Sequence, residues 1–380
     1  MSVIERIKVF RLKLLIVFFR LLPIKKNKII LWADSFKHYG CNPKYISEYI
    51  LKQYPNKFDL VWAFDGNISI PHEIPKDIRI VRYCSIEYLK ELHTAKFVIC
   101  NMRTGDSYFW HKRKEQVYIQ TWHSSLRLKT IEGDAADFLP KNHPDFARKD
   151  SEKIDVLLSG CDFSTSIFRR AFWYNGEIMK SGTPRSDILL NNPSSIRKKV
   201  FDYYRIPYKN KLILYAPTFR DDKKADLFGM DFDGLSIALN YTGEEWIIAY
   251  RLHPNILEGI DAKGCISMTQ YSDMQELICA ADLLITDYSS CMFDMAIAGK
   301  PCVLYTPDLE KYISSERGLY FDINNLPFPL AKNMDELCSV IEKFDSDKYN
   351  NRLADFIDSI GSYEDGHASE RVVNYIINNM

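Results

Sequence analysis

The chain has 380 residues, and its 50 lysine and arginine residues balance 50 aspartate and glutamate residues. Its 46% apolar and 26% charged residues exclude a disordered chain. The zero net charge argues against a general nucleic-acid binder, so no nucleic-acid partner is expected. The nine cysteines form no CxxC pair and no cluster with zinc spacing, which predicts free thiols in a reducing cytoplasm.

The first 27 residues form a basic and apolar segment. Residues 1–28 carry eight lysines and arginines against Glu5. The uncharged run between Lys13 and Arg20 has only six residues, whereas a membrane span needs about 20. We therefore expect residues 1–27 to lie at the surface of an anionic membrane. The alternative is a helix docked on its own domain.

The chain from residue 28 alternates β-rich runs with helical periodicity, which predicts a parallel sheet covered by helices on both faces. We assign residues 28–190 to a first Rossmann-like domain. Its predicted strands are Lys28–Trp32, Leu60–Phe64, Ile78–Arg82, Lys96–Cys100, Val117–Gln120, Val156–Ser159 and Ile178–Lys180.

A second series of strands follows the polar stretch 191–195, and we assign residues 195–362 to a second Rossmann-like domain. Residues 363–380 are predicted as a C-terminal helix. Two doubly wound domains that face each other leave a cleft, where ligands bind beyond the carboxyl ends of the strands. The predicted strands are Leu212–Ala216, Trp246–Tyr250, Gly264–Met268, Asp282–Thr286 and Cys302–Tyr305.

His123 is the first candidate for chemistry, because it follows a predicted strand directly. Ser124 and Ser125 come next, and Trp122 and Lys129 lie in the same segment. A histidine beside hydroxyl groups is placed to act as a general base on a substrate hydroxyl. The alternative is a histidine whose ring nitrogens are satisfied by the neighbouring backbone.

Arg251 and His253 follow a strand of the second series and lie on one side of an extended segment. A cation and a titratable donor suit a phosphate, although a strand-end arginine also serves in salt bridges. A predicted helix is preceded by four polar residues, Thr286, Asp287, Ser289 and Ser290. Hydroxyl and N–H groups there predict an anion site, with simple helix capping as the alternative.

Several blocks, taken together, resemble the CDP-glycerol glycerophosphotransferase family. They extend over nearly the whole chain and include Gln120-Thr121-Trp122-His123, Gly182-Thr183-Pro184-Arg185-Ser186-Asp187, Tyr215-Ala216-Pro217-Thr218-Phe219-Arg220, Arg251-Leu252-His253-Pro254 and Asp287-Tyr288-Ser289-Ser290. One departure is Ser124, which replaces a glycine of the family. Leu126-Arg127 also replaces a stretch that contains proline or glycine in the family.

The resemblance implies a GT-B-like fold and transfer of a polyol phosphate, most simply glycerol phosphate, from a CDP-polyol to a membrane-linked glycan, with release of CMP. It places the chain at the cytoplasmic face of the membrane, in teichoic-acid or capsule synthesis, with the first domain binding the acceptor. No cofactor or metal is expected. Two alternatives stay open: a GT-B glycosyltransferase using a nucleotide sugar, and a non-catalytic subunit of a glycan-assembly complex. Assembly into a homo-oligomer also stays open.

Within this hypothesis, His123 is the general base. His253 either lies near the donor phosphates or acts as the base in place of His123. The expected acceptor-binding residues are Trp122, Ser124, Ser125 and Lys129. The expected donor-binding residues are Arg220, Arg251, Thr286, Asp287, Ser289, Ser290 and Arg317.

Overall fold

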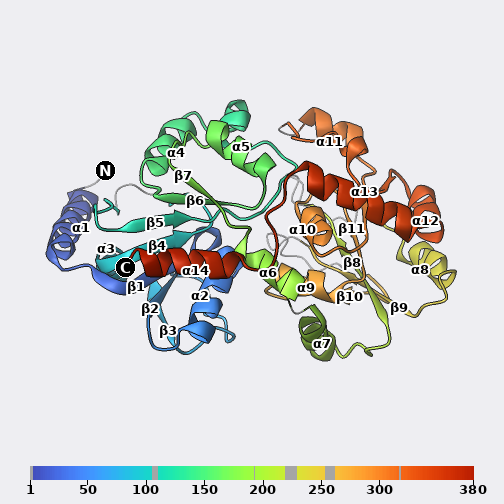
Figure 1. The fold of residues 1–380 in the computed structure, drawn as a ribbon, viewed down its shortest axis with the longest axis horizontal. Helices are drawn as coiled ribbons and strands as arrows, with labels where there is room; N and C mark the ends of the chain where they lie inside the picture. Colours follow the sequence, from blue (N-terminus) through green and yellow to red (C-terminus); the bar gives the residue numbers. More distant parts are fainter. Residues whose placement is uncertain (1–2, 105–109, 192, 219–228, 253–261, 316–317) are drawn as a thin grey trace.

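Two α/β domains lie side by side in a computed structural model of the chain, which describes residues 3–104, 110–191, 193–218, 229–252, 262–315 and 318–380 (Figure 1). The first sheet has seven parallel strands in the order β3-β2-β1-β4-β5-β6-β7. Its strands are β1 (Lys25–Trp32), β2 (Asp59–Phe64), β3 (Ile78–Arg82), β4 (Ala95–Cys100), β5 (Val117–Gln120), β6 (Val156–Ser159) and β7 (Glu177–Lys180).

The second sheet has six parallel strands in the order β10-β9-β8-β11-β12-β13. The strand order reverses beside the first strand of each sheet, which is the arrangement of doubly wound nucleotide-binding domains. The predicted GT-B-like architecture of two Rossmann-like domains is therefore confirmed. The strands are β8 (Lys211–Ala216), β9 (Trp246–Tyr250), β10 (Ile266–Ser267), β11 (Leu283–Thr286), β12 (Cys302–Tyr305) and β13 (Leu330–Ala331).

Helices and short 3₁₀ turns connect the strands of the first domain. Polar caps fix where some of them begin; for example, the Ser85 hydroxyl accepts a hydrogen bond from the Tyr88 N–H at 3.0 Å. The elements are α1 (Val3–Leu21), η1 (Asp34–Phe36), α2 (Cys41–Gln53), α3 (Ile86–Thr94), η2 (Glu132–Phe138), α4 (His143–Ser151), α5 (Asp162–Ala171) and η3 (Pro184–Ser186).

The last helix, α14, returns from the second domain to the first (Figure 1). Val372, Val373 and Ile376 of α14 are buried with Ile46 of α2. The chain therefore crosses between the domains twice. The helices from the crossing onward are α6 (Asp187–Asn191), α7 (Pro193–Tyr204), α8 (Phe232–Asn240), α9 (Met274–Ala280), α10 (Cys291–Ile297), α11 (Leu309–Ser315), η4 (Ile323–Asn325), α12 (Met334–Glu342), α13 (Ser346–Ser359) and α14 (Ala368–Asn378).

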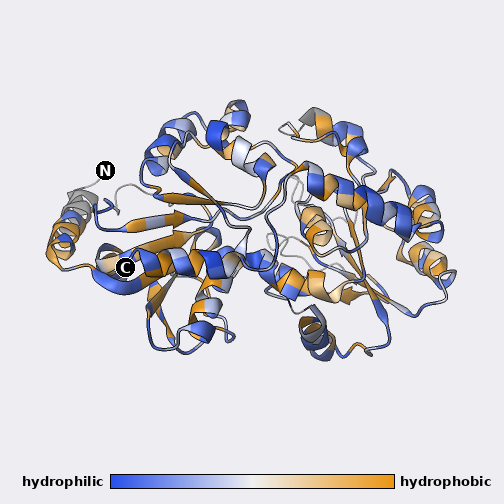
Figure 2. Ribbon diagram, in the orientation of Figure 1, coloured by the Kyte–Doolittle hydropathy of each residue, from blue (hydrophilic) through white to orange (hydrophobic). Residues whose placement is uncertain are grey.

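The strands are apolar along most of their length, as Figure 2 shows, because helices cover both faces of each parallel sheet. All four residues of β12 are buried, as are the last five of β1. The predicted strand at 264–268 shortens to Ile266–Ser267, since Gly264 adopts a left-handed φ of 81° that interrupts an extended segment. β13 was not predicted, because two residues carry no usable periodicity.

Helix α1 presents two apolar faces. Ile16 and Phe19 are buried against the first domain, where α1 packs on α3. Leu14, Val17, Phe18 and Leu21 recur at helical spacing on the other face and are between 55% and 79% exposed. The alternative of a docked helix is thus correct for one face, while the second face has no cover within the described chain. No described helix is long and apolar enough to cross a membrane.

Candidate active site

A cavity of about 340 Å³ lies between the two domains, at the carboxyl ends of β5, β8, β9 and β11. The first domain contributes the loop that follows β5, and the second contributes the loops that follow β8, β9 and β11. The charged or titratable side chains of its described lining are His123, Arg127, Lys129, Arg251, Tyr288 and Cys291, and this described lining contains no aspartate or glutamate. This cavity is therefore suited to an anionic ligand.

His123 lies in this lining with its ring nitrogen Nδ1 3.3 Å from the carbonyl oxygen of Asn101. A carbonyl oxygen only accepts, so this contact assigns the proton to Nδ1 and leaves Nε2 with a free lone pair. Burial lowers the pKa of His123 to about 4, although the negative charge of Asp34 opposes the shift. The imidazole is therefore neutral near pH 7 and able to accept a proton.

The backbone before His123 is held in an unusual conformation. Trp122 has a φ of 50°, in the left-handed region that a bulky residue rarely adopts. The Trp122 N–H donates to the Gln120 side-chain oxygen at 2.9 Å, and the Gln120 amide donates to the Met102 carbonyl at 2.9 Å. The Trp122 carbonyl accepts from the Asn42 amide at 3.0 Å. These bonds fix the direction in which His123 points.

A chain of buried and partly buried hydrogen bonds joins this loop to the second domain. The oxygen of the Asn42 side chain accepts from the Arg185 N–H at 2.9 Å. The guanidinium of Arg185 then donates to both carboxylate oxygens of Asp294, at 2.6 and 2.5 Å. Asp294 belongs to α10, which begins directly after Ser289 and Ser290. We call Asn42, Arg185 and Asp294 the interdomain brace; it ties the Trp122–His123 loop to the opposite wall of the cavity.

The predicted donor-binding residues of the second domain divide into two groups. Arg251, Ser289 and Ser290 line the cavity. Thr286 and Asp287 lie behind the lining: the Thr286 hydroxyl donates to the Ala216 carbonyl at 2.6 Å, and Asp287 accepts from the Thr218 N–H at 2.8 Å. Both are almost fully buried and hold neighbouring loops together. Arg220, His253 and Arg317 lie outside the described residues.

The predicted acceptor-binding residues also divide. Trp122, Ser124 and Lys129 line the cavity, and the Lys129 ammonium lies 5.1 Å from the centre of the Tyr312 ring. Ser125 is buried away from the lining, where its carbonyl accepts from the Ser164 hydroxyl at 2.6 Å. Ser124, which replaces the family glycine, is not among the residues with positive φ, so its position does not require a glycine.

The sequence reasoning missed Arg127 as a lining residue and noted it only as a departure from the family pattern. A usable signal was present, because Arg127 is a second cation in the loop that already contained Lys129. No group of three or more histidine, cysteine, aspartate or glutamate side chains that could hold a metal occurs in the described part of the chain.

Residues 14–378 match the family model described as CDP-glycerol:poly(glycerophosphate) glycerophosphotransferase. The teichoic acid poly(glycerol phosphate) polymerase of Bacillus subtilis (strain 168) is 32% identical over 372 residues, which cover 93% of this chain and 49% of that polymerase. The chain thus spans about half the length of that relative. It covers 95% of the teichoic acid glycerol-phosphate transferase of Staphylococcus aureus (strain NCTC 8325 / PS 47), which is 31% identical over 94% of this chain.

A solved structure of the wall teichoic acid polymerase TagF has a TM-score of 0.85 to this chain at 29% identity, and the match covers 99% of this chain and 95% of that one. The family match, the relatives and this structure agree along nearly the full length of the chain. This protein is a member of the CDP-glycerol:poly(glycerophosphate) glycerophosphotransferase family.

Proposed function

We propose that the chain transfers glycerol phosphate from CDP-glycerol to a hydroxyl group of a membrane-linked glycan, with release of CMP. The observation that carries this proposal is the charge of the cavity. Three cations, Arg127, Lys129 and Arg251, line it without any described carboxylate. Such a lining favours a ligand with several phosphate charges. The similar TagF polymerase was also solved after a soak with CDPG.

In the proposed mechanism, the acceptor hydroxyl attacks the phosphorus atom that carries the glycerol, and the bond from that phosphorus to the CMP oxygen breaks. The neutral His123 takes the hydroxyl proton at Nε2. Arg251, with Ser289 and Ser290, stabilises the charge that develops on the departing phosphate. His253 remains the proposed alternative base.

The test is release of CMP by the purified chain, given CDP-glycerol together with a lipid-linked glycan acceptor. CDP-ribitol and a UDP-sugar replace the donor in parallel reactions. Acceptor-dependent CMP release with CDP-glycerol supports the proposal. A preference for CDP-ribitol changes the proposed polyol from glycerol to ribitol. UDP release from the UDP-sugar, without CMP release from either CDP-polyol, contradicts it.

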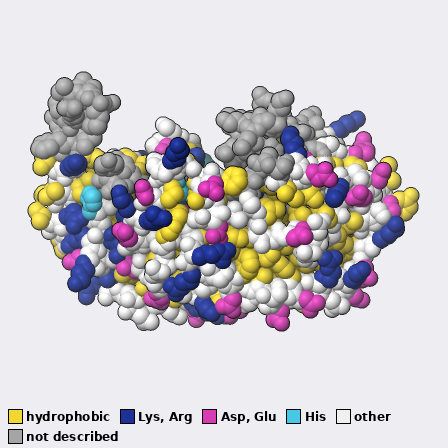
Figure 3. Space-filling model, turned by 90° about the horizontal axis from the view of Figure 1, so that it is seen from above, with side chains coloured by type: hydrophobic (Ala, Val, Ile, Leu, Met, Phe, Trp, Pro, Cys, Tyr) yellow, Lys and Arg dark blue, Asp and Glu magenta, His cyan; other side chains and the backbone are white. Residues whose placement is uncertain are grey.

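We also propose that α1 holds the chain on the cytoplasmic face of an anionic membrane. Its outward face exposes Leu14, Val17, Phe18 and Leu21, and Lys13, Lys25 and Lys26 are exposed nearby. Figure 3 shows hydrophobic side chains beside lysine and arginine at the end of the molecule where α1 lies. Apolar insertion and attraction to anionic head groups act together in such surfaces.

Sedimentation with vesicles tests this contact. We expect the chain to sediment with vesicles that contain anionic lipid, and the Val17→Ser/Phe18→Ser variant to sediment several-fold less. Tyr203→Ser/Tyr208→Ser is the matched control, because these aromatic side chains are equally exposed but belong to the second domain, at and just after α7. Equal sedimentation of all three proteins contradicts a role for α1.

A further inference from the structure

Arg127 is a buried arginine that forms no ion pair with a carboxylate of the described residues. Its side chain lines the cavity, yet the residue is only 4% exposed. Its Nη2 donates to the Ser124 carbonyl at 3.2 Å, and its guanidinium lies 4.5 Å from the centre of the Phe168 ring. Its Nε and Nη1 atoms are buried and have no hydrogen-bond partner within the described chain.

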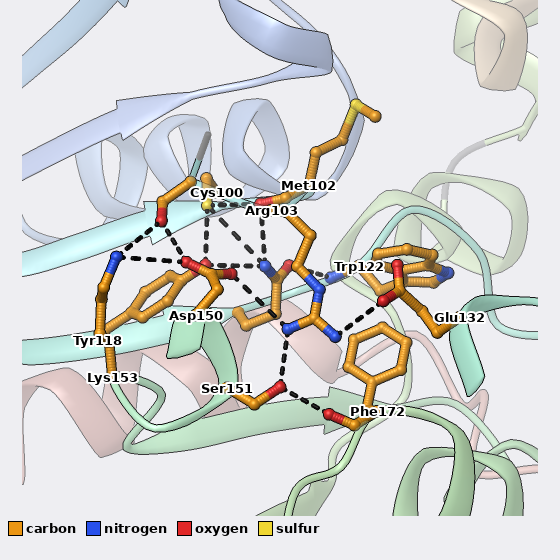
Figure 4. Close-up of polar contacts among 12 residues, drawn as sticks. Cys100, Met102, Arg103, Tyr118, Trp122, Glu132, Asp150, Ser151, Lys153 and Phe172 are labelled. Carbon is orange, nitrogen blue, oxygen red and sulfur yellow. Dashed lines mark hydrogen bonds and ion pairs between the residues drawn. The ribbon is translucent and has the colours of Figure 1, made fainter. Parts of the chain in front are cut away.

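Arg103 provides a direct contrast in the same domain. It is similarly buried, and its guanidinium lies 4.4 Å from the centre of the Phe172 ring. Arg103 forms ion pairs with Glu132 at 3.1 Å and with Asp150 at 3.6 Å (Figure 4). Arg127 has no ion pair with any described aspartate or glutamate. Among the described residues, carboxylates therefore pair with one of these two buried arginines and not with the other.

An unpaired buried cation destabilises a folded protein unless it stays neutral or gains a partner. Burial lowers the pKa of Arg127 to about 10, so the guanidinium remains charged near neutral pH. Proteins retain residues that lower the stability of the free protein where those residues serve binding or catalysis. The position of Arg127 in a cavity lining therefore points to a ligand that pairs with its charge. An anion in the cavity would supply both the missing charge and acceptors for the guanidinium.

We propose that Arg127 binds a phosphate group of a substrate in the cavity. Arg127 lies four residues after His123 on the wall of the first domain, whereas Arg251, Ser289 and Ser290 lie on the wall of the second. The phosphate belongs either to the donor diphosphate or to an acceptor that carries a phosphate beside its attacking hydroxyl. This choice of source rests on the proposed function, but the binding of a phosphate group does not.

The first experiment measures binding and stability without any turnover. Inorganic pyrophosphate is titrated calorimetrically into the wild type, Arg127→Met, Arg127→Lys and Arg170→Met. We expect Arg127→Met to bind roughly 10- to 100-fold more weakly, because charge-assisted hydrogen bonds are lost, and Arg127→Lys to be intermediate. Arg170→Met is the charge control and should bind like the wild type, because Arg170 is exposed, is paired with Asp134 and does not line the cavity.

The melting temperature separates ligand binding from a structural role. Without ligand, Arg127→Met should melt at or above the wild-type temperature, since it removes an unbalanced buried charge. Pyrophosphate should raise the melting temperature of the wild type, relative to potassium chloride of equal ionic strength, and should leave that of Arg127→Met unchanged. Pyrophosphate binding that is equal in both proteins overturns the proposal, and so does an Arg127→Met variant that melts lower or does not fold.

Turnover then identifies the source of the phosphate. Two acceptors are compared with CDP-glycerol, one with a phosphate beside the attacking hydroxyl and one without it. A loss of kcat/KM in Arg127→Met that is confined to the phosphate-bearing acceptor assigns the phosphate to the acceptor. An equal loss with both acceptors and a raised KM for CDP-glycerol assign it to the donor. If the wild type turns over neither acceptor, the proposed function fails, while the pyrophosphate titration still decides the role of Arg127.

Discussion

The polar network around Arg103, in the first domain, and the lining of the cavity between the domains differ in how their charges are balanced. In the loop after β4 and in the segments packed against it, Arg103 and Lys153 are paired with Glu132 and Asp150, so that cations and carboxylates balance (Figure 4). The cavity lining, in contrast, contains Arg127, Lys129 and Arg251 and no described carboxylate. A balanced buried network stabilises the fold, whereas a buried cation such as Arg127, which has no ion pair with a described carboxylate, gains a partner when an anionic ligand binds.

The largest expected effect of a change in the cavity is on chemistry. His123→Ala should lower turnover with CDP-glycerol by roughly 10²- to 10⁴-fold, because a general base contributes that much. The melting temperature should stay close to that of the wild type, since the hydrogen bond of the His123 ring within the described residues is the one with the Asn101 carbonyl. CMP release and a thermal melt measure the two quantities.

His367→Ala is the matched histidine control, because His367 is exposed, pairs with Glu370 and does not line the cavity. It should keep wild-type turnover. A loss of less than tenfold in His123→Ala would remove His123 as the base and leave His253 as the candidate.

In the network of Arg103, Lys153, Glu132 and Asp150, a substitution should affect the stability of the fold more than turnover. Arg103→Met removes the cation that pairs with both buried carboxylates and leaves Asp150 with Lys153 at 3.6 Å and Glu132 with His143 at 3.2 Å. This should lower the free energy of unfolding by about 3 kcal/mol, the lower end for a broken buried ion pair. Urea denaturation measures this loss. Arg79→Met is the control: Arg79 also contacts two carboxylates but is 48% exposed, so its loss should cost about 0–1 kcal/mol. Equal costs at both sites would mean that burial does not distinguish these networks.

The interdomain brace connects the loop of the proposed base, His123, to the cavity wall of the second domain, so weakening it should affect the alignment of the two walls. Asp294→Asn keeps the size of the side chain but removes the charge that holds Arg185. We expect kcat to fall roughly 10- to 100-fold, because small errors in the position of reacting groups are costly. The KM for CDP-glycerol should change little, since Asp294 does not line the cavity. Unchanged kcat with a lower melting temperature would limit the brace to a structural role.

The smallest expected effect is the response to pH. Burial lowers the pKa of His123 to about 4, so the base form persists as the pH falls and protonation begins only near that value. We therefore expect kcat/KM to change less than about twofold between pH 8 and pH 5, since this ratio reports the free enzyme. An acid limb with a midpoint near 6.5, the ordinary value for histidine, would contradict the buried environment of His123.

Much of the fold was readable from local patterns. Strands such as Val117–Gln120 and Trp246–Tyr250 were predicted to the residue, because each is a short apolar run followed by polar residues. The same logic predicted where His123, Arg251 and residues 289–290 would meet, since the carboxyl ends of parallel strands face one cleft. It did not decide that Thr286 and Asp287 lie behind the lining, because these residue types suit an anion site as well as the loop contacts that they make.

Local sequence therefore defines the elements, the family and most of the loops around the cavity. It does not define which charges are balanced, because ion pairs join residues far apart in the chain. Arg103 and Glu132 are 29 residues apart, and Arg185 and Asp294 are 109 residues apart. Arg103 and Arg127 both follow strands of the same sheet and are indistinguishable by pattern. Only tertiary packing brought carboxylates to Arg103 and left Arg127 facing the cavity, since a charge is balanced by its neighbours in space.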